Sequence, residues 1–324
     1  MSSISPYMDH LSGPLDLVTT YEDKRAGFLA LAFEKSTRMT PFLNEARVLR
    51  QAARAAKEPM ELLLIPSIQH ALLKASGFSD KAEAFLSETD IKNAKKELIK
   101  NFLEPAGTNF IDELVYRFLL TQGDALGGIM RNVGGMWGKV KFLEMLRAAF
   151  HNSGIEYEIL LRESRKWQKN SRANISSGEI RAVRWYNKND DQSQDEFRTF
   201  IIDFTVKIVG KNVDACLLRG VRDKLSDTYF QEPANYISLG ELKGGIDPAG
   251  ADEHWKTGNT ALQRIRDAFN RERYHPQTFF VGAAIENSMA MEIWDQLIQG
   301  TLNNAANLTK VSHMESLCLW MLRL

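Results

Sequence analysis

Residues 236–254 read "YISLGELKGGIDPAGADEH", and this stretch decides the fold. Its apolar start is typical of a buried strand, but the strand ends in Glu241 and Lys243 and then breaks into a glycine- and proline-rich loop. Because side chains two apart on a strand point to the same face, Glu241 and Lys243 project together while Leu242 points into the core. An exposed ion pair of this kind contributes at most about 1 kcal/mol, so the tripeptide alone indicates little.

The segments on either side of this strand predict a mixed sheet. Upstream, residues 197–209 alternate as a strand does, and after a turn residues 213–220 return as the second strand of a hairpin. Downstream, a helix at 260–274 leads to an apolar strand at 278–285, a crossover that makes this strand parallel to the quoted one. Further regular segments are expected as strands at 155–161 and 180–187 and a helix at 288–300. Residues 151–324 are therefore predicted to form an α/β (α+β) domain whose mixed central sheet is flanked by helices.

Residues 1–150 are predicted to be helical throughout, because they are rich in Ala, Leu, Glu and Lys and their apolar residues recur every three or four positions. A glycine-rich passage at 123–139, "GDALGGIMRNVGGMWGK", is expected to come before another helix. Its glycine spacing does not match a phosphate-binding loop and no strand precedes it, so close backbone packing is the preferred interpretation.

The overall composition is that of an ordinary globular protein without a charge bias. Lys plus Arg and Asp plus Glu number 41 each, so any nucleic-acid surface must come from local segregation of charge. Cys216 and Cys318 lie in apolar surroundings, which indicates small core residues and neither a disulfide framework nor a zinc site. No signal pattern and no apolar run of membrane-spanning length is present, so we expect a soluble protein of the cytoplasm.

A second acid raises the significance of Glu241 and Lys243. Asp214 begins the returning strand of the hairpin, and if that strand pairs with the quoted one, the two carboxylates meet at one edge of the sheet. Carboxylates about 4 Å apart repel by roughly 4 kcal/mol at an effective dielectric near 20. A cation between them would relieve this, and hard oxygen ligands select Mg²⁺. With Lys243 able to hold or help deprotonate a water, this set suits metal-dependent phosphodiester hydrolysis.

The order Asp214…Glu241-Leu242-Lys243 resembles the core motif of PD-(D/E)xK nucleases. Residues 240–266, "GELKGGIDPAGADEHWKTGNTALQRIR", resemble more specifically the AvaI/BsoBI group of type II restriction endonucleases, and the resemblance extends over the whole chain. The family pattern implies that Asp214, Glu241 and the backbone carbonyl of Leu242 are the metal ligands. One departure is Val213, which stands where the motif has proline, so Asp203 in "IIDFTV" remains an alternative first acid.

The resemblance also implies how the enzyme works. Such enzymes are homodimers that enclose double-stranded DNA, require Mg²⁺ and cut both strands of the degenerate palindrome C^YCGRG, leaving 5′-phosphate ends with four-base 5′ overhangs. Residues 1–150 would then embrace DNA and dimerise, and 151–324 would be the catalytic domain. A two-fold dimer presents one active site to each strand of a palindrome. No methyltransferase motif is present, so a separate cognate methyltransferase would protect the host.

Two residues of the loop after Lys243 are candidates for further roles. His254 follows the loop and is predicted to contact the attacking water or a phosphate, although a lone histidine is more often structural. Asp247 is predicted to read a base, because a carboxylate can accept a hydrogen bond from cytosine N4 in the major groove. The alternative for Asp247 is a solvated loop residue.

Phosphate contacts are expected from clustered basic residues, although solvated faces are the commoner explanation of such clusters. One set is predicted to share a side of a single helix and comprises Arg47, Arg50, Arg54 and Lys57. A second run comprises Arg162, Arg165, Lys166, Lys169 and Arg172. Lys81 follows an expected N-cap, where the helix dipole disfavours a cation by about 0.3–1 kcal/mol, and a DNA contact would offset this.

Two other functions remain open on these residues. One is another PD-(D/E)xK nuclease, such as a repair or junction-resolving enzyme. The other is a non-catalytic DNA-binding protein in which Glu241 and Lys243 form only an ion pair. The glycine-rich loop and the large helical half favour a restriction endonuclease over the first, and a nuclease assay with and without Mg²⁺ would distinguish the second.

Overall fold

A computed structural model describes residues 5–164, 166–169, 175–186, 197–220 and 228–324. Of the residues predicted to contact phosphates, Arg165 and Arg172 lie outside these ranges.

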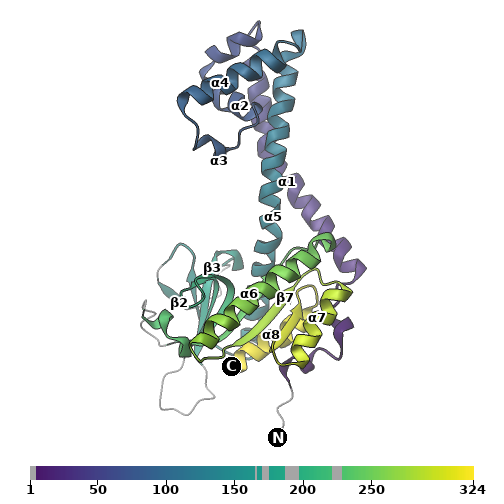
Figure 1. Ribbon diagram of the computed structural model, residues 1–324, viewed down its shortest axis with the longest axis vertical. Coiled ribbons are helices and arrows are strands. Elements are labelled where there is room, and N and C mark those ends of the chain that lie inside the picture. The colour runs from purple at the N-terminus through teal and green to yellow at the C-terminus, as the bar shows by residue number, and fades with distance from the viewer. Residues whose placement is uncertain (1–4, 165, 170–174, 187–196, 221–227) are drawn as a thin grey trace. The chain divides into compact units, whose positions relative to one another are not determined.

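Eight strands of the described residues form one sheet in the order β2-β1-β3-β4-β5-β6-β7-β8 (Figure 1). Neighbouring strands are antiparallel from β2 to β6, whereas β6 pairs with β7 and β7 with β8 in parallel. The predicted α/β (α+β) class, the hairpin and the parallel crossover are thus confirmed. The strands are β1 (Tyr157–Leu161), β2 (Trp167–Lys169), β3 (Ile180–Tyr186), β4 (Phe197–Val206), β5 (Lys211–Gly220), β6 (Tyr236–Lys243), β7 (Gln277–Gly282) and β8 (Asn304–Asn307).

Helices make up most of the remaining structure. The α-helices are α1 (Tyr21–Ala53), α2 (Gln69–Ala75), α3 (Asp80–Glu83), α4 (Glu88–Leu98), α5 (Phe110–Asn152), α6 (Ala251–Arg271), α7 (Asn287–Ile298) and α8 (Val311–Arg323). The 3₁₀ segments are η1 (Pro6–Asp9), η2 (Pro14–Leu17), η3 (Pro59–Leu64), η4 (Pro66–Ile68), η6 (Gly107–Asn109), η7 (Ser177–Glu179), η8 (Tyr229–Gln231), η9 (Pro233–Asn235) and η10 (Pro248–Gly250). One turn of π-helix, η5 (Ile99–Leu103), follows α4.

Helices cover both faces of the sheet. Phe279 of β7 stacks on Phe142 of α5 and meets Trp320 of α8 edge-on. Its neighbour Phe280 meets Trp255 of α6 with the ring centroids 5.1 Å apart. Because successive strand residues point to opposite faces, α5 and α8 cover one face and α6 covers the other, together with α7. A strand buried on both sides explains the continuous apolar run of β7.

The chain forms two compact units. The first consists of Met1–Phe28 and Val133–Leu324 and contains the sheet, and the second consists of Leu29–Asn132. The second unit has its own apolar core, which includes Leu49, Leu72 and Leu114. The change from helix to strand near residue 150 falls between α5 and β1, whereas the compact units divide the chain at other positions.

The glycine-rich passage 123–139 does not interrupt helical structure. It lies inside α5, which is continuous over 43 residues. A Cβ on Gly138 would lie 2.9 Å from Cα of Gly244 and 3.1 Å from Leu242, and the backbone of Gly134 also lies against Gly244. The expected start of a new helix after this passage was therefore wrong, and the interpretation of its glycines as close backbone packing is confirmed for Gly134 and Gly138 but not for Gly123, Gly127 or Gly135.

Two smaller expectations concern cysteines and membranes. Cys216 and Cys318 are both free and buried, as predicted. Within the described residues, no helix combines the length and the apolar character needed to cross a membrane.

Candidate active site

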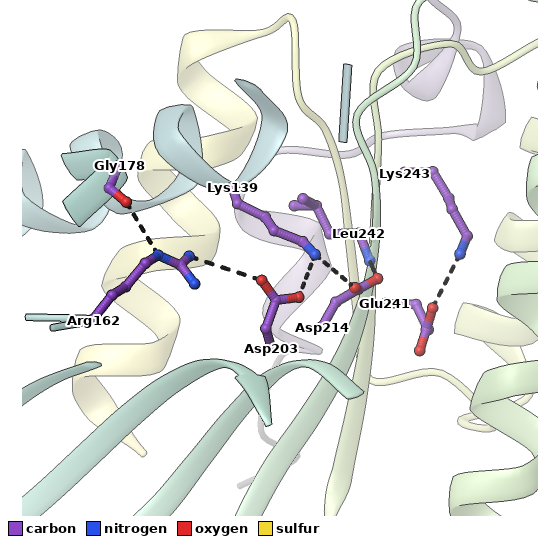
Figure 2. A network of polar contacts seen from close by, with 8 residues as sticks. All are labelled: Lys139, Arg162, Gly178, Asp203, Asp214, Glu241, Leu242 and Lys243. Atoms are coloured by element: carbon purple, nitrogen blue, oxygen red, sulfur yellow. Dashed lines mark hydrogen bonds and ion pairs between the residues drawn. The ribbon is translucent and has the colours of Figure 1, made fainter. Parts of the chain in front are cut away.

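The two predicted acids meet where β5 and β6 pair. Ala215 is the partner of Gly240 in this antiparallel register, so Asp214 and Glu241 lie one step further along the same edge. The Asp214 carboxylate accepts a hydrogen bond from the backbone N–H of Leu242 through Oδ2, at 3.0 Å (Figure 2). The structure therefore brings Asp214 to the strand that carries the acid-x-lysine sequence, and it buries Leu242 as expected.

Glu241 is a buried carboxylate with one cation beside it. Only 7% of its side chain is exposed, and Nζ of Lys243 lies 3.2 Å from Oε2. Burial raises the pKa of Glu241 to about 7, and the neighbouring negative charge of Asp214 acts in the same direction, while Lys243 opposes both. Lys243 therefore offsets only part of the effect that burial and Asp214 have on Glu241.

Asp203, the alternative first acid, lies on β4 beside Asp214 of the neighbouring strand β5. Ile202 pairs with Ala215 and Phe204 pairs with Val213, which sets Asp203 opposite Asp214 across β4 and β5. Figure 2 shows Asp214 between Asp203 and Glu241. This order favours Asp214 as the acid that acts together with Glu241.

Two further cations approach these acids. The ammonium of Lys139, from α5, contacts the Asp203 carboxylate and lies 3.2 Å from Oδ1 of Asp214. Burial alone would lower the pKa of Lys139, but its contacts with Asp203 and Asp214 raise it above its ordinary value. Arg162 donates a hydrogen bond to the carbonyl of Gly178 and lies 3.8 Å from Asp203. The Arg162 side chain thus lies at the acid cluster.

Sequence reasoning missed Lys139. It is 64 residues away from Asp203 in the chain, and its only local signal is that it ends the glycine-rich passage of α5. The close approach of Gly138 to Gly244 brings this part of α5 against the end of β6. A contact that depends on the packing of a helix on a loop has no periodic signature in the sequence.

His254 lies in the first turn of α6, against the loop that follows Lys243. A Cβ on Gly245 would lie 2.7 Å from Cε1 of its ring, and Gly250 lies against the same ring. Nδ1 of His254 is buried and has no hydrogen-bond partner in the described part of the chain. Burial lowers the pKa of His254, and the positive charge of Lys243 lowers it further. A neutral imidazole next to the acid–lysine group can accept a proton.

Asp247 lies on the exposed side of this loop. Its backbone is extended, with φ −71° and ψ 114°, as expected for a residue before proline. One carboxylate oxygen, Oδ1, accepts a hydrogen bond from the N–H of Ala249 at 2.9 Å, so the side chain caps the short helix η10. The other carboxylate oxygen is not used in this cap.

The carboxylates at the edge of β5 and β6 fit a divalent cation. Asp214 and Glu241 offer hard oxygen atoms, and the backbone carbonyl of Leu242 lies between Glu241 and Lys243 in the chain. Burial is the main cause of the raised pKa of Glu241, and the negative charge of Asp214 raises it further. A cation would offset the negative charge of both acids, so the donor set suits Mg²⁺.

The basic residues of the second unit are exposed, but they do not share one helix as predicted. The helix α1 ends at Ala53, so Arg54 lies in a turn and Lys57 in the loop before Pro59. That loop is stabilised by a hydrogen bond from the Lys57 N–H to Glu61, and Pro59 begins η3. The prediction of one helical face for all four residues was therefore wrong.

The other described residues that were predicted to contact phosphates are also exposed. Arg47 bonds to Asn44 through its guanidinium, and Arg50 forms an ion pair of 2.7 Å with Asp112, so part of its charge is neutralised locally. Lys81 is exposed in α3 after the N-cap Ser79, which accepts a hydrogen bond from Ala82 as expected for a cap. In the first unit, Lys166 and Lys169 are exposed near the ends of β2.

Known proteins resemble this chain over its whole length. A family model described as "Restriction endonuclease BsobI" matches residues 7–324. The type II restriction enzyme BsoBI of Geobacillus stearothermophilus is 46% identical over 338 residues, which cover 100% of both chains. The type II restriction enzymes AvaI of Nostoc sp. strain PCC 7120 and of Anabaena variabilis are each 48% identical over 321 residues, covering 98% of this chain and 100% of theirs. The chain therefore belongs to the BsoBI family of restriction endonucleases.

Proposed function

We propose that this restriction endonuclease hydrolyses one phosphodiester bond in each strand of duplex DNA at the degenerate palindrome C^YCGRG. The products would carry 5′-phosphates and four-base 5′ overhangs, and the reaction would require Mg²⁺. The observation that carries the chemistry is the meeting of Asp214, Glu241 and Lys243 at one sheet edge, with Glu241 buried. The target site rests on the similarity to the AvaI and BsoBI enzymes over the full length of the chain.

Asp214, Glu241 and the backbone carbonyl of Leu242 are the proposed ligands of Mg²⁺. When bound, the ion would stabilise the negative charge that develops on the phosphate during in-line attack. Lys243 lies beside Glu241 and has a side chain that is 23% exposed, so its ammonium can orient the attacking water and contact the phosphate. His254 is held neutral by burial and by Lys243, and its imidazole is the proposed acceptor of the proton of that water.

Recognition of the DNA is assigned to exposed groups. Asp247 is proposed to accept a hydrogen bond from a cytosine amino group, since its carboxylate is exposed and only one oxygen is used within the loop. Basic residues that bind phosphates fix the register of the protein on the duplex without reading its sequence. The proposed set comprises Lys81, Arg47, Arg50, Arg54, Lys57, Arg162 and Lys166.

The proposed assembly is a homodimer around double-stranded DNA in the bacterial cytoplasm. A two-fold axis shared with the palindrome would bring one active site to each strand. A separate methyltransferase would protect host DNA at the same sites.

Digestion of a plasmid of known sequence tests this proposal directly. With Mg²⁺ the purified protein should cut at every CYCGRG site and nowhere else, and with EDTA it should not cut. Sequencing of the ends should give a break after the first cytosine on both strands. Cleavage in EDTA, cleavage at unrelated sites or intact plasmid in Mg²⁺ would contradict the proposal.

A further inference from the structure

Lys139 and Asp203 belong to the acid cluster, but the proposed chemistry uses neither of them. The ammonium of Lys139 lies between two carboxylates, in contact with Asp203 and 3.2 Å from Oδ1 of Asp214 (Figure 2). The lysine side chain is only 22% exposed, so water screens these interactions incompletely. Lys139 therefore acts electrostatically on the carboxylate that is proposed to bind Mg²⁺.

The two acids that share Lys139 lie close together on neighbouring strands of the sheet. The flanking pairs Ile202–Ala215 and Phe204–Val213 place Asp203 beside Asp214, and like charges that lie close together on neighbouring strands are unfavourable. Asp203 also has a φ of 56°, in the left-handed region that residues other than glycine seldom adopt. A conformation of this kind persists where surrounding contacts hold it, and Lys139 and Arg162 provide such contacts.

The oxygens of Asp214 have different partners. Oδ2 is bound to the N–H of Leu242 at 3.0 Å, which fixes the carboxylate against β6. Oδ1 faces Lys139. An ammonium and a divalent cation are both attracted to the same carboxylate. Because the two positive charges repel each other, they do not readily bind it at the same time. If Lys139 leaves Asp214, its contact with Asp203 is still available.

We propose that Lys139 is an internal counter-ion that competes with the divalent cation for Asp214, and that Asp203 is the residue that holds Lys139 once the cation binds. This inference rests on the proposed metal site at Asp214 and Glu241. In this arrangement Asp203 is not a metal ligand. It acts through Lys139 as a positioning residue, which explains why a third acid is kept in a left-handed conformation beside the other two.

The test is the affinity of the full-length protein for Mn²⁺, measured without DNA from the electron paramagnetic resonance signal of the free ion. Mn²⁺ prefers hard oxygen ligands and substitutes for Mg²⁺ at such sites. Lys139→Gln should bind Mn²⁺ about fivefold more tightly than the parent, because one competing ion pair is gone. Lys141→Gln removes the same charge from the same helix and should bind within about twofold of the parent. Equal or weaker binding by Lys139→Gln would overturn the inference.

Asp203→Asn tests the second half of the proposal and keeps the size of the side chain. Asparagine also adopts the left-handed conformation, so this variant should fold. In the parent background it should weaken Mn²⁺ binding about fivefold, because Lys139 then remains on Asp214. In the Lys139→Gln background its effect should shrink to about twofold or less. Equal losses in both backgrounds would mean that Asp203 acts on the cation directly, and the role given to Lys139 would be wrong.

Asp214→Asn separates this inference from the proposed function. If Asp214→Asn binds Mn²⁺ as the parent does, the proposed metal site itself fails and the inference fails with it. If Asp214→Asn loses binding while Lys139→Gln matches the parent, only the inference fails. Thermal melting of each variant in EDTA checks that it is folded. Should Lys139→Gln not fold, parental affinity for Mn²⁺ in Asp203→Asn would still overturn the inference.

Discussion

At the scale of single residues, ionisation of the buried Glu241 carboxyl destabilises the folded protein. Its pKa of about 7 in the folded protein lies above the ordinary value of 4.5, because the side chain is buried and faces Asp214. Below pH 4.5 the folded and unfolded states are both protonated there, so Glu241 does not favour either. Between pH 4.5 and 7 the unfolded protein loses this proton more readily than the folded protein, which lowers the free energy of unfolding. Above pH 7 the folded protein has lost the proton as well, and the destabilisation has reached its full size.

Glu241→Gln should therefore stabilise the protein at alkaline pH. In EDTA, the gain in free energy of unfolding should be small at pH 5 and reach up to about 3 kcal/mol at pH 8. Thermal or urea unfolding at both pH values measures it. Glu315→Gln, at an exposed position of α8, serves as the control and should give similar differences at the two pH values. A gain that does not grow between pH 5 and pH 8 would contradict the assignment.

Three substitutions separate chemistry from binding. Asp214→Ala, Glu241→Ala and Lys243→Ala should each reduce cleavage by about 10²–10³-fold or more, since each removes a group beside the reacting phosphate. Binding to a CYCGRG duplex should remain detectable by gel shift, because affinity comes mainly from contacts elsewhere. If Asp214→Ala cuts normally while Asp203→Ala is inactive, the first acid is Asp203.

Asp247→Ala should reduce specificity more than general DNA affinity. One lost base contact is worth about 1–3 kcal/mol, so binding to the target should weaken while binding to random DNA changes little. The dependence of affinity on salt should also stay nearly the same, because phosphate contacts are untouched. Unchanged affinity for the target, combined with a higher Mg²⁺ requirement for cleavage, would assign Asp247 to the metal site instead.

At the scale of elements, the glycines of α5 allow a helix to approach the end of β6. A Cβ on Gly138 would meet Gly244 and Leu242, whereas a Cβ on Gly135 would meet nothing within 4 Å. The same helix therefore offers a matched pair of positions. A substitution at Gly138 tests the close packing, and a substitution at Gly135 tests only the effect of glycine on helix stability.

Gly138→Ala should destabilise the protein by about 1–3 kcal/mol, because it overpacks the contact between α5 and the loop. Gly135→Ala should stabilise it by about 0.5–1 kcal/mol, since alanine loses less backbone entropy in a helix. Denaturant unfolding of the two variants measures both effects. Equal shifts in the same direction would show that the packing at Gly138 is not restrictive.

At the scale of the whole molecule, the proposed homodimer should be stable without DNA. Large apolar side chains of the second unit are exposed, including Phe85 and Leu120, and burial in a subunit interface would favour association. Sedimentation equilibrium should give twice the chain mass of 36.8 kDa at micromolar concentration. A monomer that nevertheless cuts both strands in one binding event would contradict this assembly.

The sequence by itself determined what depends on neighbours in the chain. Alternation and turn residues predicted β4 and β5, an apolar run predicted β7, and the acid-x-lysine spacing put Glu241 and Lys243 on one side of β6. These features follow from the two-residue period of a strand and from local backbone preferences. The short strand β8 has the sequence "NAAN" and was not predicted, because its buried asparagines resemble a turn.

Only the tertiary structure decided which distant groups meet. Strand register brought Asp203 opposite Asp214, and the packing of α5 against Gly244 brought Lys139 to both carboxylates. The helix α5 also continues through its glycines, against their low helix propensity, and two of them, Gly134 and Gly138, pack against Gly244. Contacts between segments far apart in the chain depend on register and on the shapes of whole elements, and no local period in the sequence records them.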